Sequence, residues 1–451
     1  MALVERELVG GECSFYACMP SKALLRPPEL LAEVGRVPGA AEAVTGSLDV
    51  QATLDRRDEV IHDLDDSAQL PWIEDRGITL VRGEARLDGE RRLTVRGGGG
   101  NGESITLVAR DAVILATGSG AAMPPIPGLA DAGAWSNRQI TTATAVPPRL
   151  VILGGGVVGV EMAQAWSALG SRVTVIEAQE RLIGTEEPIA SEIVATGLSD
   201  AGVEVICGVA AESVSRDGEG VAIRLADGRT VTGDRLLVAV GRRPWTDGLG
   251  LETVDVEPGD GGYLEVDDQL RVGGSPWLYA IGDCNGRALL THAGKYQARI
   301  AADVILGELG GAAVADTFGT PRVVFTDPQV TAAGMTAEAA RARYGDHRVA
   351  VIDLDTNASA GASFHGRGAP GRARFVVDTE RAVLVGVCIT GPDVAEWIHG
   401  AAIAIVGAVP LGRLAHVIAP FPTRSELWLQ FLEAYEQARG VSVHTTAPRL
   451  G

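Results

Sequence analysis

The stretch RLVILGGGVVGVEMAQAWSALGSRVTVIE, Arg149 to Glu177, decides the fold class of this 451-residue chain. A short apolar run leads into a glycine-rich loop that contains Gly154, Gly156 and Gly159. An amphipathic helical run and a second apolar run follow, and the second run closes on Glu177. Strand, G-x-G-x-x-G loop, helix, strand and acidic residue in this order are typical of a dinucleotide-binding unit. The stretch therefore predicts an α/β fold with a parallel sheet.

This unit also indicates which nucleotide is bound. The pyrophosphate is expected at the helix N-terminus, where backbone N–H groups and the helix dipole favour negative charge. Glu177 is expected to bind the ribose 2′-hydroxyl and to repel a 2′-phosphate, so NADH is favoured over NADPH. Arg181 is close enough in sequence to keep that preference moderate. The predicted NAD contacts are Gly154, Gly156, Val157, Gly159 and Glu177.

A second informative stretch is GGECSFYACMPSK, Gly10 to Lys22, which places Cys13 and Cys18 in a glycine-led turn. The MPSKALL run reads as the start of a helix, and a helix N-terminus lowers the pKa of a thiol. A cysteine pair of this kind can accept and pass on two electrons. From the spacing alone, two unrelated reduced cysteines are an equally good interpretation.

With GG before the pair and PSK after it, this block resembles the redox-active disulfide segment of the pyridine nucleotide-disulfide oxidoreductases. This is the flavoprotein family of dihydrolipoamide dehydrogenase, glutathione reductase and mercuric reductase. The resemblance runs from Ala2 to about Ala438 in sequential order. It implies two Rossmann-like dinucleotide-binding domains, for FAD and for NAD, and a C-terminal α+β dimerisation domain. The expected boundaries are 1–145 (FAD), 146–265 (NAD), 266–318 (return to the FAD and central domain), 319–440 (dimerisation) and 441–451 (tail).

The first residues correspond to the middle of the expected FAD unit. Ala2 to Val4 read as a buried strand, and Glu5 at its end is the acidic residue expected at the adenosine ribose. A first strand and a G-x-G-x-x-G loop are expected before it. We therefore interpret the chain as N-terminally truncated relative to the family, through a misplaced start or a real deletion.

The resemblance also assigns positions on the flavin side. The ATGS block, Ala116 to Ser119, matches the exit strand of the flavin domain, and Asp283 matches an aspartate that binds the ribityl chain. The implied FAD contacts are Glu5, Gly11, Ala85, Thr117, Gly118, Ser119, Asp283, Leu289, Leu290, Thr291 and His292. By the same comparison, Val209 and Gly241 contact NAD.

The resemblance implies a linear path for electrons. NADH reduces the flavin, the flavin reduces the disulfide through Cys18, and Cys13 is released to exchange with an acceptor. Lys22 and Glu161 match a pair near the reactive edge of the flavin, where they would tune its electronics.

The main departure from the family lies near the C-terminus. Dithiol-handling members carry an HPTxxE motif whose histidine, from the other subunit, moves protons and is oriented by the glutamate. Here the run is FPTRSE, with Phe421 at the histidine position and Glu426 at the glutamate position. Loss of a positioned acid or base costs about 100-fold to 10,000-fold in rate, so efficient turnover of lipoamide or glutathione is not expected. His416 and His365 match no catalytic position.

The remaining cysteines and the composition narrow the range of functions. Cys207, Cys284 and Cys388 read as packing residues, and no metal site is predicted. The net charge of −19 without a Lys/Arg-rich run argues against nucleic-acid and anionic-membrane partners. No apolar run approaches the roughly 20 residues that span a bilayer. Five cysteines spread over the chain do not resemble the disulfide framework of a secreted protein, so a cytoplasmic location is predicted.

Three functions follow from these observations. The leading prediction is a homodimeric, FAD-dependent oxidoreductase that passes electrons from NADH to a Cys13–Cys18 disulfide and on to a small-molecule acceptor, which is a disulfide, a quinone or a metal ion. The first alternative is a diaphorase or quinone reductase that acts directly from the flavin. The second is not an enzyme but an FAD-deficient, NAD-binding remnant.

Overall fold

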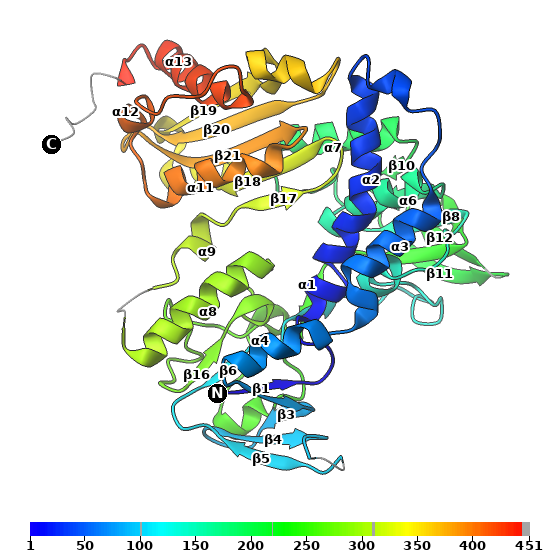
Figure 1. Cartoon of the computed structure of the whole chain (residues 1–451), viewed down its shortest axis with the longest axis vertical. Coiled ribbons are helices and arrows are strands. Elements are labelled where there is room, and N and C mark those ends of the chain that lie inside the picture. Colours follow the sequence, from blue (N-terminus) through cyan, green and yellow to red (C-terminus); the bar gives the residue numbers. More distant parts are fainter. Residues whose placement is uncertain (100–101, 219, 309–311, 444–451) are drawn as a thin grey trace. The chain divides into compact units, whose positions relative to one another are not determined.

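The computed structural model of the chain describes residues 1–99, 102–218, 220–308 and 312–443 (Figure 1). It is a mixed α/β structure, as predicted. The chain divides into two compact units, and each unit is assembled from three separated segments. Unit 1 contains residues 1–20, 55–122 and 241–317, and unit 2 contains residues 21–54, 123–240 and 318–451.

Unit 1 is built from small sheets. Its two parallel pairs are β1 (Ala2–Glu5) with β2 (Thr79–Arg82) and β6 (Val113–Leu115) with β16 (Leu278–Ala280). Its antiparallel strands are β3 (Glu84–Leu87), β4 (Arg92–Arg96) and β5 (Ile105–Val108), and β7 (Ser119–Ala121) with β15 (Arg242–Pro244). Its helices are α1 (Gly11–Phe15), α4 (Leu70–Asp75) and α8 (Thr291–Leu306), while α2 (Cys18–Arg36), α3 (Val50–Val60) and α9 (Ala315–Phe318) carry the chain from one unit to the other.

The first strand differs in burial from the prediction. Ala2 to Val4 do form a strand, but Ala2 and Leu3 are exposed and Val4 is only half-buried. The prediction of a buried strand is therefore wrong. In the described structure β1 pairs with β2 alone, and a strand with one neighbour keeps much of its surface in water.

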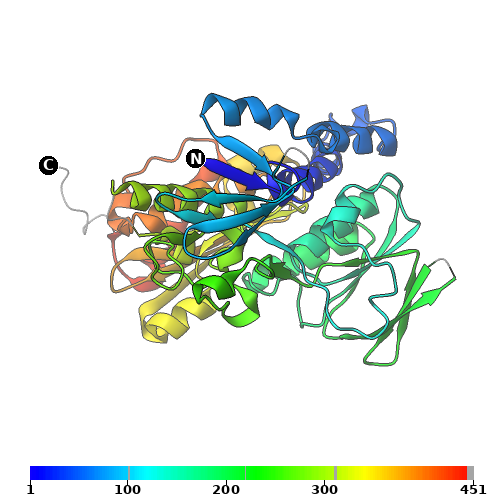
Figure 2. The same ribbon diagram turned by 90° about the horizontal axis from the view of Figure 1, so that it is seen from below.

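The middle of unit 2 contains a four-stranded parallel sheet in the order β10-β9-β8-β14. The strands are β8 (Arg149–Leu153), β9 (Arg172–Ile176), β10 (Glu204–Ile206) and β14 (Arg235–Val238). Alternate residues of a strand face opposite sides of its sheet. Leu150 and Ile152 pack with α6 (Val157–Ala168), whereas Val151 and Leu153 face a second sheet. That sheet is antiparallel and contains β11 (Ala211–Asp217), β12 (Gly220–Leu225) and β13 (Thr230–Gly233) (Figure 2).

Two further helices accompany this part of the chain. They are α5 (Asn137–Thr141), which begins with a capping box at Ser136, and α7 (Pro188–Asp200), which begins at a proline.

The C-terminal part of unit 2 is a five-stranded antiparallel sheet in the order β17-β18-β21-β20-β19. Its strands are β17 (Arg322–Val324), β18 (Gln329–Gly334), β19 (Val349–Asp355), β20 (Arg372–Asp378) and β21 (Val383–Gly391). One face packs on α11 (Ile398–Val406) and α13 (Leu427–Arg439), where Phe375 stacks on Phe431 with ring centroids 4.3 Å apart. The other face packs on α10 (Ala337–Tyr344), and α12 (Leu411–Leu414) lies between α11 and α13 in the chain.

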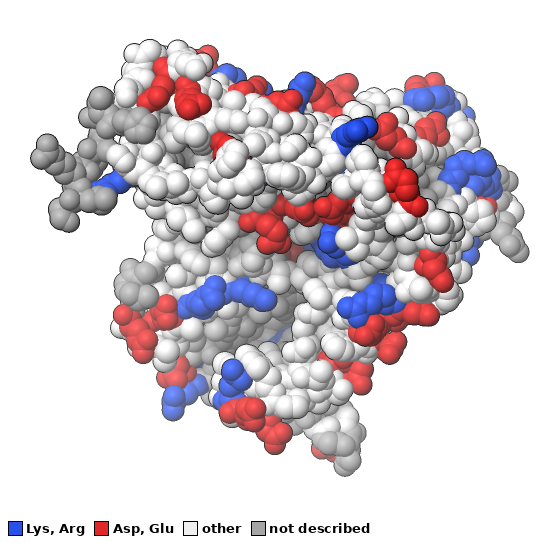
Figure 3. All heavy atoms as spheres, turned by 45° about the horizontal axis from the view of Figure 1, so that its top comes forward, with Lys and Arg blue, Asp and Glu red and all other residues white. Residues whose placement is uncertain are grey.

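The surface agrees with the acidic composition. On the described part of the face drawn in Figure 3, Lys and Arg side chains lie among Asp and Glu side chains and form no continuous basic field. Within the described ranges, no helix combines the length and the apolar character needed to cross a membrane.

Candidate active site

The loop after β8 has the close packing that a dinucleotide-binding unit requires. A Cβ atom added at Gly159 would lie 1.9 Å from the carbonyl oxygen of Gly154, so α6 approaches the loop more closely than any other residue allows. Gly154 has φ +106°, and a Cβ atom there would lie 2.4 Å from the carbonyl oxygen of Ala239. At Gly156 no atom lies within 4 Å of an added Cβ atom, so that side of the loop is open to a ligand.

Glu177 lies at the end of β9, beside this loop. Its Oε2 accepts a hydrogen bond of 2.6 Å from the backbone N–H of Gly155, and its Oε1 accepts one of 2.8 Å from the N–H of Gln179. These bonds fix the carboxylate next to the open side of the loop. Val209 donates its backbone N–H to the carbonyl of Glu177 at 3.3 Å, and Val157 is an exposed residue that begins α6. The residues of this part of unit 2 therefore fit a pyridine nucleotide.

The guanidinium of Arg181 is held by other groups. It donates to the carbonyl oxygens of Glu186 and Gly184 and to the hydroxyl of Ser191, at 2.6 to 2.8 Å. Although Arg181 is close to Glu177 in the sequence, its guanidinium is therefore not free to bind a 2′-phosphate.

Lys22 and Glu161 form the predicted pair. Lys22 Nζ lies 2.8 Å from Glu161 Oε2, and the Glu161 side chain is only 3% exposed. Glu161 Oε1 accepts a second hydrogen bond of 2.9 Å from the backbone N–H of Phe325. A buried carboxylate is costly without partners, and here both oxygens have one. The ammonium of Lys22 also lies 4.8 Å from the centroid of the Phe325 ring.

The two cysteines of the opening segment lie in unit 1. Cys13 is in α1, Cys18 is the first residue of α2, and both are half-buried thiols in the structure. The glycine before them is required, because Gly10 has φ +125° and an added Cβ atom would lie 3.0 Å from the Phe15 ring. Cys18 Sγ lies 3.8 Å from the hydroxyl oxygen of Thr291, the residue that begins α8. The structure thus brings the cysteine segment to the stretch predicted to lie beneath the flavin.

Asp283 lies in a three-residue network that also belongs to unit 1. Its carboxylate accepts a short hydrogen bond from the hydroxyl of Ser119 and lies 3.3 Å from Arg242 Nε. Arg242 Nε donates to the Ser119 hydroxyl at 2.6 Å, and Arg242 Nη2 donates to the Ser119 carbonyl at 2.7 Å. Ser119 and Asp283 are among the predicted flavin contacts, whereas Arg242 is not. The signal was present, because Arg242 follows the predicted contact Gly241.

The glycines around this network leave room for a cofactor. Gly118 and Gly282 have φ +71° and +72°, and neither has an atom within 4 Å of an added Cβ atom. Both turns therefore present open backbone beside the Asp283 carboxylate, and these residues fit the ribityl side of a flavin.

The remaining predicted FAD contacts are spread over unit 1. Glu5 accepts a hydrogen bond of 2.8 Å from the N–H of Glu7 and ends β1, and Ala85 lies in β3. The others are exposed or half-buried residues at the start of α1, between elements, or at the start of α8: Gly11, Thr117, Leu289, Leu290 and His292.

The FPTRSE run is held by its neighbours within unit 2. Phe421 is 75% exposed. Glu426 Oε2 accepts a hydrogen bond of 3.2 Å from the backbone N–H of Ala360. Arg424 lies over the Trp397 ring at 4.1 Å, and its burial lowers the pKa of the guanidinium to about 10. The glutamate expected to orient a histidine is therefore bound to a backbone amide.

Two of the other three cysteines are buried, and the third, Cys207, is a half-buried residue directly after β10. Cys284 and Cys388 are buried, and burial raises the pKa of both thiols. Burial also raises the pKa of the half-buried Cys207 thiol, with Glu177 and Glu180 adding to the effect. High thiol pKa values make all three poor nucleophiles.

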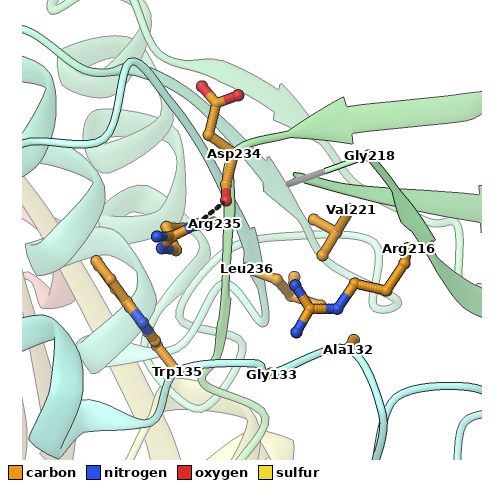
Figure 4. Close-up of a pocket in the computed structure, with 9 residues that line it drawn as sticks. All are labelled: Ala132, Gly133, Trp135, Arg216, Gly218, Val221, Asp234, Arg235 and Leu236. Atoms are coloured by element: carbon orange, nitrogen blue, oxygen red, sulfur yellow. Dashed lines mark hydrogen bonds between the residues drawn. The ribbon is translucent and has the colours of Figure 1, made fainter.

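One cavity of unit 2 lies outside the predicted site. It has a volume of about 500 Å³ and is found where β14 begins, with Trp135, Arg216 and Arg235 around it (Figure 4). The predicted nucleotide loop follows the other end of the neighbouring parallel strand β8. In α/β sheets ligands bind outside the carboxyl ends of the strands, so this cavity is not the nucleotide site.

Comparison with known proteins defines the class. The family model described as pyridine nucleotide-disulphide oxidoreductase matches residues 1–298, and the model of the dimerisation domain of that family matches residues 320–431. The chain belongs to the pyridine nucleotide-disulphide oxidoreductases. The resemblance and the fold class predicted from the sequence are confirmed, and FAD and a pyridine nucleotide are the cofactors of this family.

Two curated relatives cover most of the chain. Dihydrolipoyl dehydrogenase of Haloferax volcanii is 30% identical over 449 residues, which are 98% of this chain and 92% of the relative. Mercuric reductase of Acidithiobacillus ferrooxidans is 33% identical over 436 residues, which are 94% of this chain and 76% of the relative.

Solved structures agree with this assignment. LpdA from Mycobacterium tuberculosis superposes with a TM-score of 0.83 and 25% identity, over 99% of this chain and 94% of that chain. The Cu(II) complex of the HOCl-induced flavoprotein disulfide reductase RclA from Escherichia coli gives a TM-score of 0.81 and 26% identity, over 95% and 92%.

Proposed function

We propose that the protein is an NADH-dependent flavoprotein that reduces a Cys13–Cys18 disulfide and passes the electrons to a small-molecule acceptor. Bound FAD would supply hydride acceptance from NADH and two-electron transfer to the disulfide. The overall step consumes NADH, one proton and the disulfide and yields NAD⁺ and two thiols. The observation that carries the proposal is the 3.8 Å approach of Cys18 to Thr291, which joins the cysteine segment to the predicted flavin stretch.

Each group of residues has its own part in this scheme. The glycine loop and Glu177 bind the nucleotide, and the Ser119–Arg242–Asp283 network presents a carboxylate to the ribityl hydroxyls. Cys18 begins α2, where the helix N-terminus favours its thiolate, and Cys13 is the cysteine that exchanges with the acceptor. The buried carboxylate of Glu161 pairs with Lys22 and positions the lysine ammonium.

Anaerobic titration with NADH tests the disulfide role. The wild-type protein is expected to take up about two electrons per chain more than the Cys13→Ser variant, because a disulfide stores two electrons. Cys207→Ser, which changes a cysteine outside the pair, is the matched control and should titrate like the wild type. Equal electron uptake by the wild type and Cys13→Ser would show that the disulfide has no part in the reaction.

The nucleotide preference rests on Glu177. Its carboxylate lies beside the open side of the loop, and Arg181, the cation nearest in sequence, is bound to other groups. A 2′-phosphate would meet this negative charge without compensation, so we propose NADH as the reductant. A higher kcat/KM for NADH than for NADPH is expected in the wild type, and Glu177→Ser should narrow the difference. A wild type that uses both nucleotides equally would contradict this preference.

The acceptor is constrained by Phe421. A phenylalanine cannot move a proton to or from the thiols, so we propose an acceptor whose reduction needs little proton transfer, such as a quinone, a metal ion or a reactive disulfide. The same residue favours a second candidate function, in which a quinone is reduced directly from the flavin. Quinone reduction that persists undiminished in Cys13→Ser would select this second function.

A histidine introduced at position 421 tests whether this position is where the family's proton-moving histidine acts. Phe421→His is expected to raise the rate of dihydrolipoamide oxidation by about 100-fold or more, the usual effect of a positioned acid or base. Phe364→His changes another exposed phenylalanine of unit 2 and should leave the rate unchanged. If Phe421→His has no effect on this rate, position 421 is not where the proton shuttle of the family acts.

The match to the dimerisation domain supports a homodimer. This part of the chain exposes large apolar side chains that a partner could cover, with Val417 at 69%, Ile418 at 92% and Phe421 at 75%. We propose that these residues face a second copy of the chain. The cytoplasmic location stays a prediction from the sequence.

A further inference from the structure

Unit 2 brings together one histidine and two carboxylates from distant parts of the chain. Glu33 lies in α2, His365 ends the 3₁₀ turn Ala360–His365, and Asp393 follows β21. His365 Nδ1 lies 3.8 Å from Glu33 Oε1 and 3.9 Å from Asp393 Oδ2. One ligand atom of each residue lies within 4.8 Å of the corresponding atoms of the other two.

These separations are too long for hydrogen bonds, which join N and O at about 2.7 to 3.2 Å. They are close to the spacing of atoms that share an ion. Zinc binds histidine nitrogen and carboxylate oxygen at about 2.0 to 2.2 Å, so two ligands at a tetrahedral angle lie about 3.4 Å apart. The two distances from His365 Nδ1 need to shorten by only about 0.5 Å to meet that geometry.

Two arginines are close enough to feel the charge of these carboxylates, and each donates a hydrogen bond to another group. Arg26 is close enough for Glu33 and Asp393 to raise the pKa of its guanidinium, but the hydrogen bond to Glu29, at 2.7 Å, is the larger cause. Arg424, which also feels the charge of Asp393, donates to the carbonyl of Pro392. A divalent cation between the two carboxylates would remove their mutual repulsion.

The backbone holds the histidine against the helix. Arg367 donates its N–H to the carbonyl of Arg36, the last residue of α2, at 2.9 Å. Gly366 has φ +93°, and an added Cβ atom would lie 2.3 Å from the same carbonyl oxygen. The residues after His365 therefore pack directly on the end of α2. The side chains of His365, Glu33 and Asp393 are 25%, 30% and 40% exposed, so an ion can reach them from water.

We propose that Glu33, His365 and Asp393 form a binding site for a divalent cation of the zinc class. An imidazole with two carboxylates suits Zn²⁺ better than Mg²⁺ or Ca²⁺, which prefer oxygen ligands alone. Three protein ligands leave the fourth position to water. The bound ion joins α2, the helix that begins at Cys18, to two loops of the C-terminal domain. No metal site was predicted from the sequence, because the three residues have no recognisable ligand spacing.

Equilibrium dialysis against Zn²⁺, with the metal counted per chain by mass spectrometry, tests this proposal. The wild type is expected to bind about one zinc ion per chain more than Asp393→Asn or His365→Ala, with at least tenfold weaker binding at this site in either variant. His347→Ala is the matched control, because His347 is an exposed histidine elsewhere in the C-terminal domain. Asparagine at 393 keeps the size of the side chain and tolerates the left-handed φ of +54°.

Two results would overturn the site. The first is equal zinc binding by all four proteins: the wild type, Asp393→Asn, His365→Ala and His347→Ala. The absence of zinc binding in all four counts as this result. The second is Ca²⁺ binding as tight as Zn²⁺ binding and unchanged in His365→Ala, because the imidazole would then not be a ligand. Zinc held by Cys13 and Cys18 does not affect the comparison, since all four proteins carry both thiols. Melting curves recorded without zinc show whether each variant is folded.

Discussion

The contact between α6 and the loop after β8 is the constraint on which the nucleotide half of the site depends. Gly159 can approach the carbonyl of Gly154 only because it has no side chain, and this approach fixes where the N-terminus of α6 points. Glu161 follows two residues later on the same helix, and its buried carboxylate binds both Lys22 on α2 and the amide of Phe325, the residue after β17. One helix therefore serves the nucleotide loop and the charge pair. A shift of α6 would disturb both, since a buried carboxylate that loses a partner is costly.

The chemistry follows from what surrounds each redox group. The cysteine pair begins at a glycine turn and continues into the start of α2, whereas the other cysteines lie where burial raises the thiol pKa. Phe421, at the position where the family resemblance predicts a histidine, is exposed, and the carboxylate of Glu426 accepts a hydrogen bond from the backbone N–H of Ala360. In the proposed function, Cys13 and Cys18 store the electrons, and Phe421 cannot move a proton. The proposed acceptor is therefore one whose reduction does not require a proton shuttle at the thiols.

Much of the fold could be predicted because local sequence dictates it. The glycines at 154 and 159 and the acid at 177 follow from the spacing of a strand-loop-helix-strand unit, and the contact of Lys22 with Glu161 follows from the family resemblance. Features that depend on tertiary neighbours were missed or wrong. The burial of Ala2 and Leu3 depends on how many strands flank β1. The role of Arg242 depends on its contacts with Ser119 and Asp283, which are both distant from it in the sequence. The cluster of Glu33, His365 and Asp393 is likewise invisible until the chain folds.

The proposed function requires that NADH reduces a disulfide between Cys13 and Cys18. Differential alkylation before and after anaerobic addition of NADH, read by peptide mass spectrometry, measures this directly. Both cysteines are expected to resist alkylation in the isolated protein and to become alkylated after NADH, while Cys284 and Cys388 do not change. If Cys13 and Cys18 are already fully alkylated before NADH, or stay protected after it, NADH does not reduce a disulfide between them.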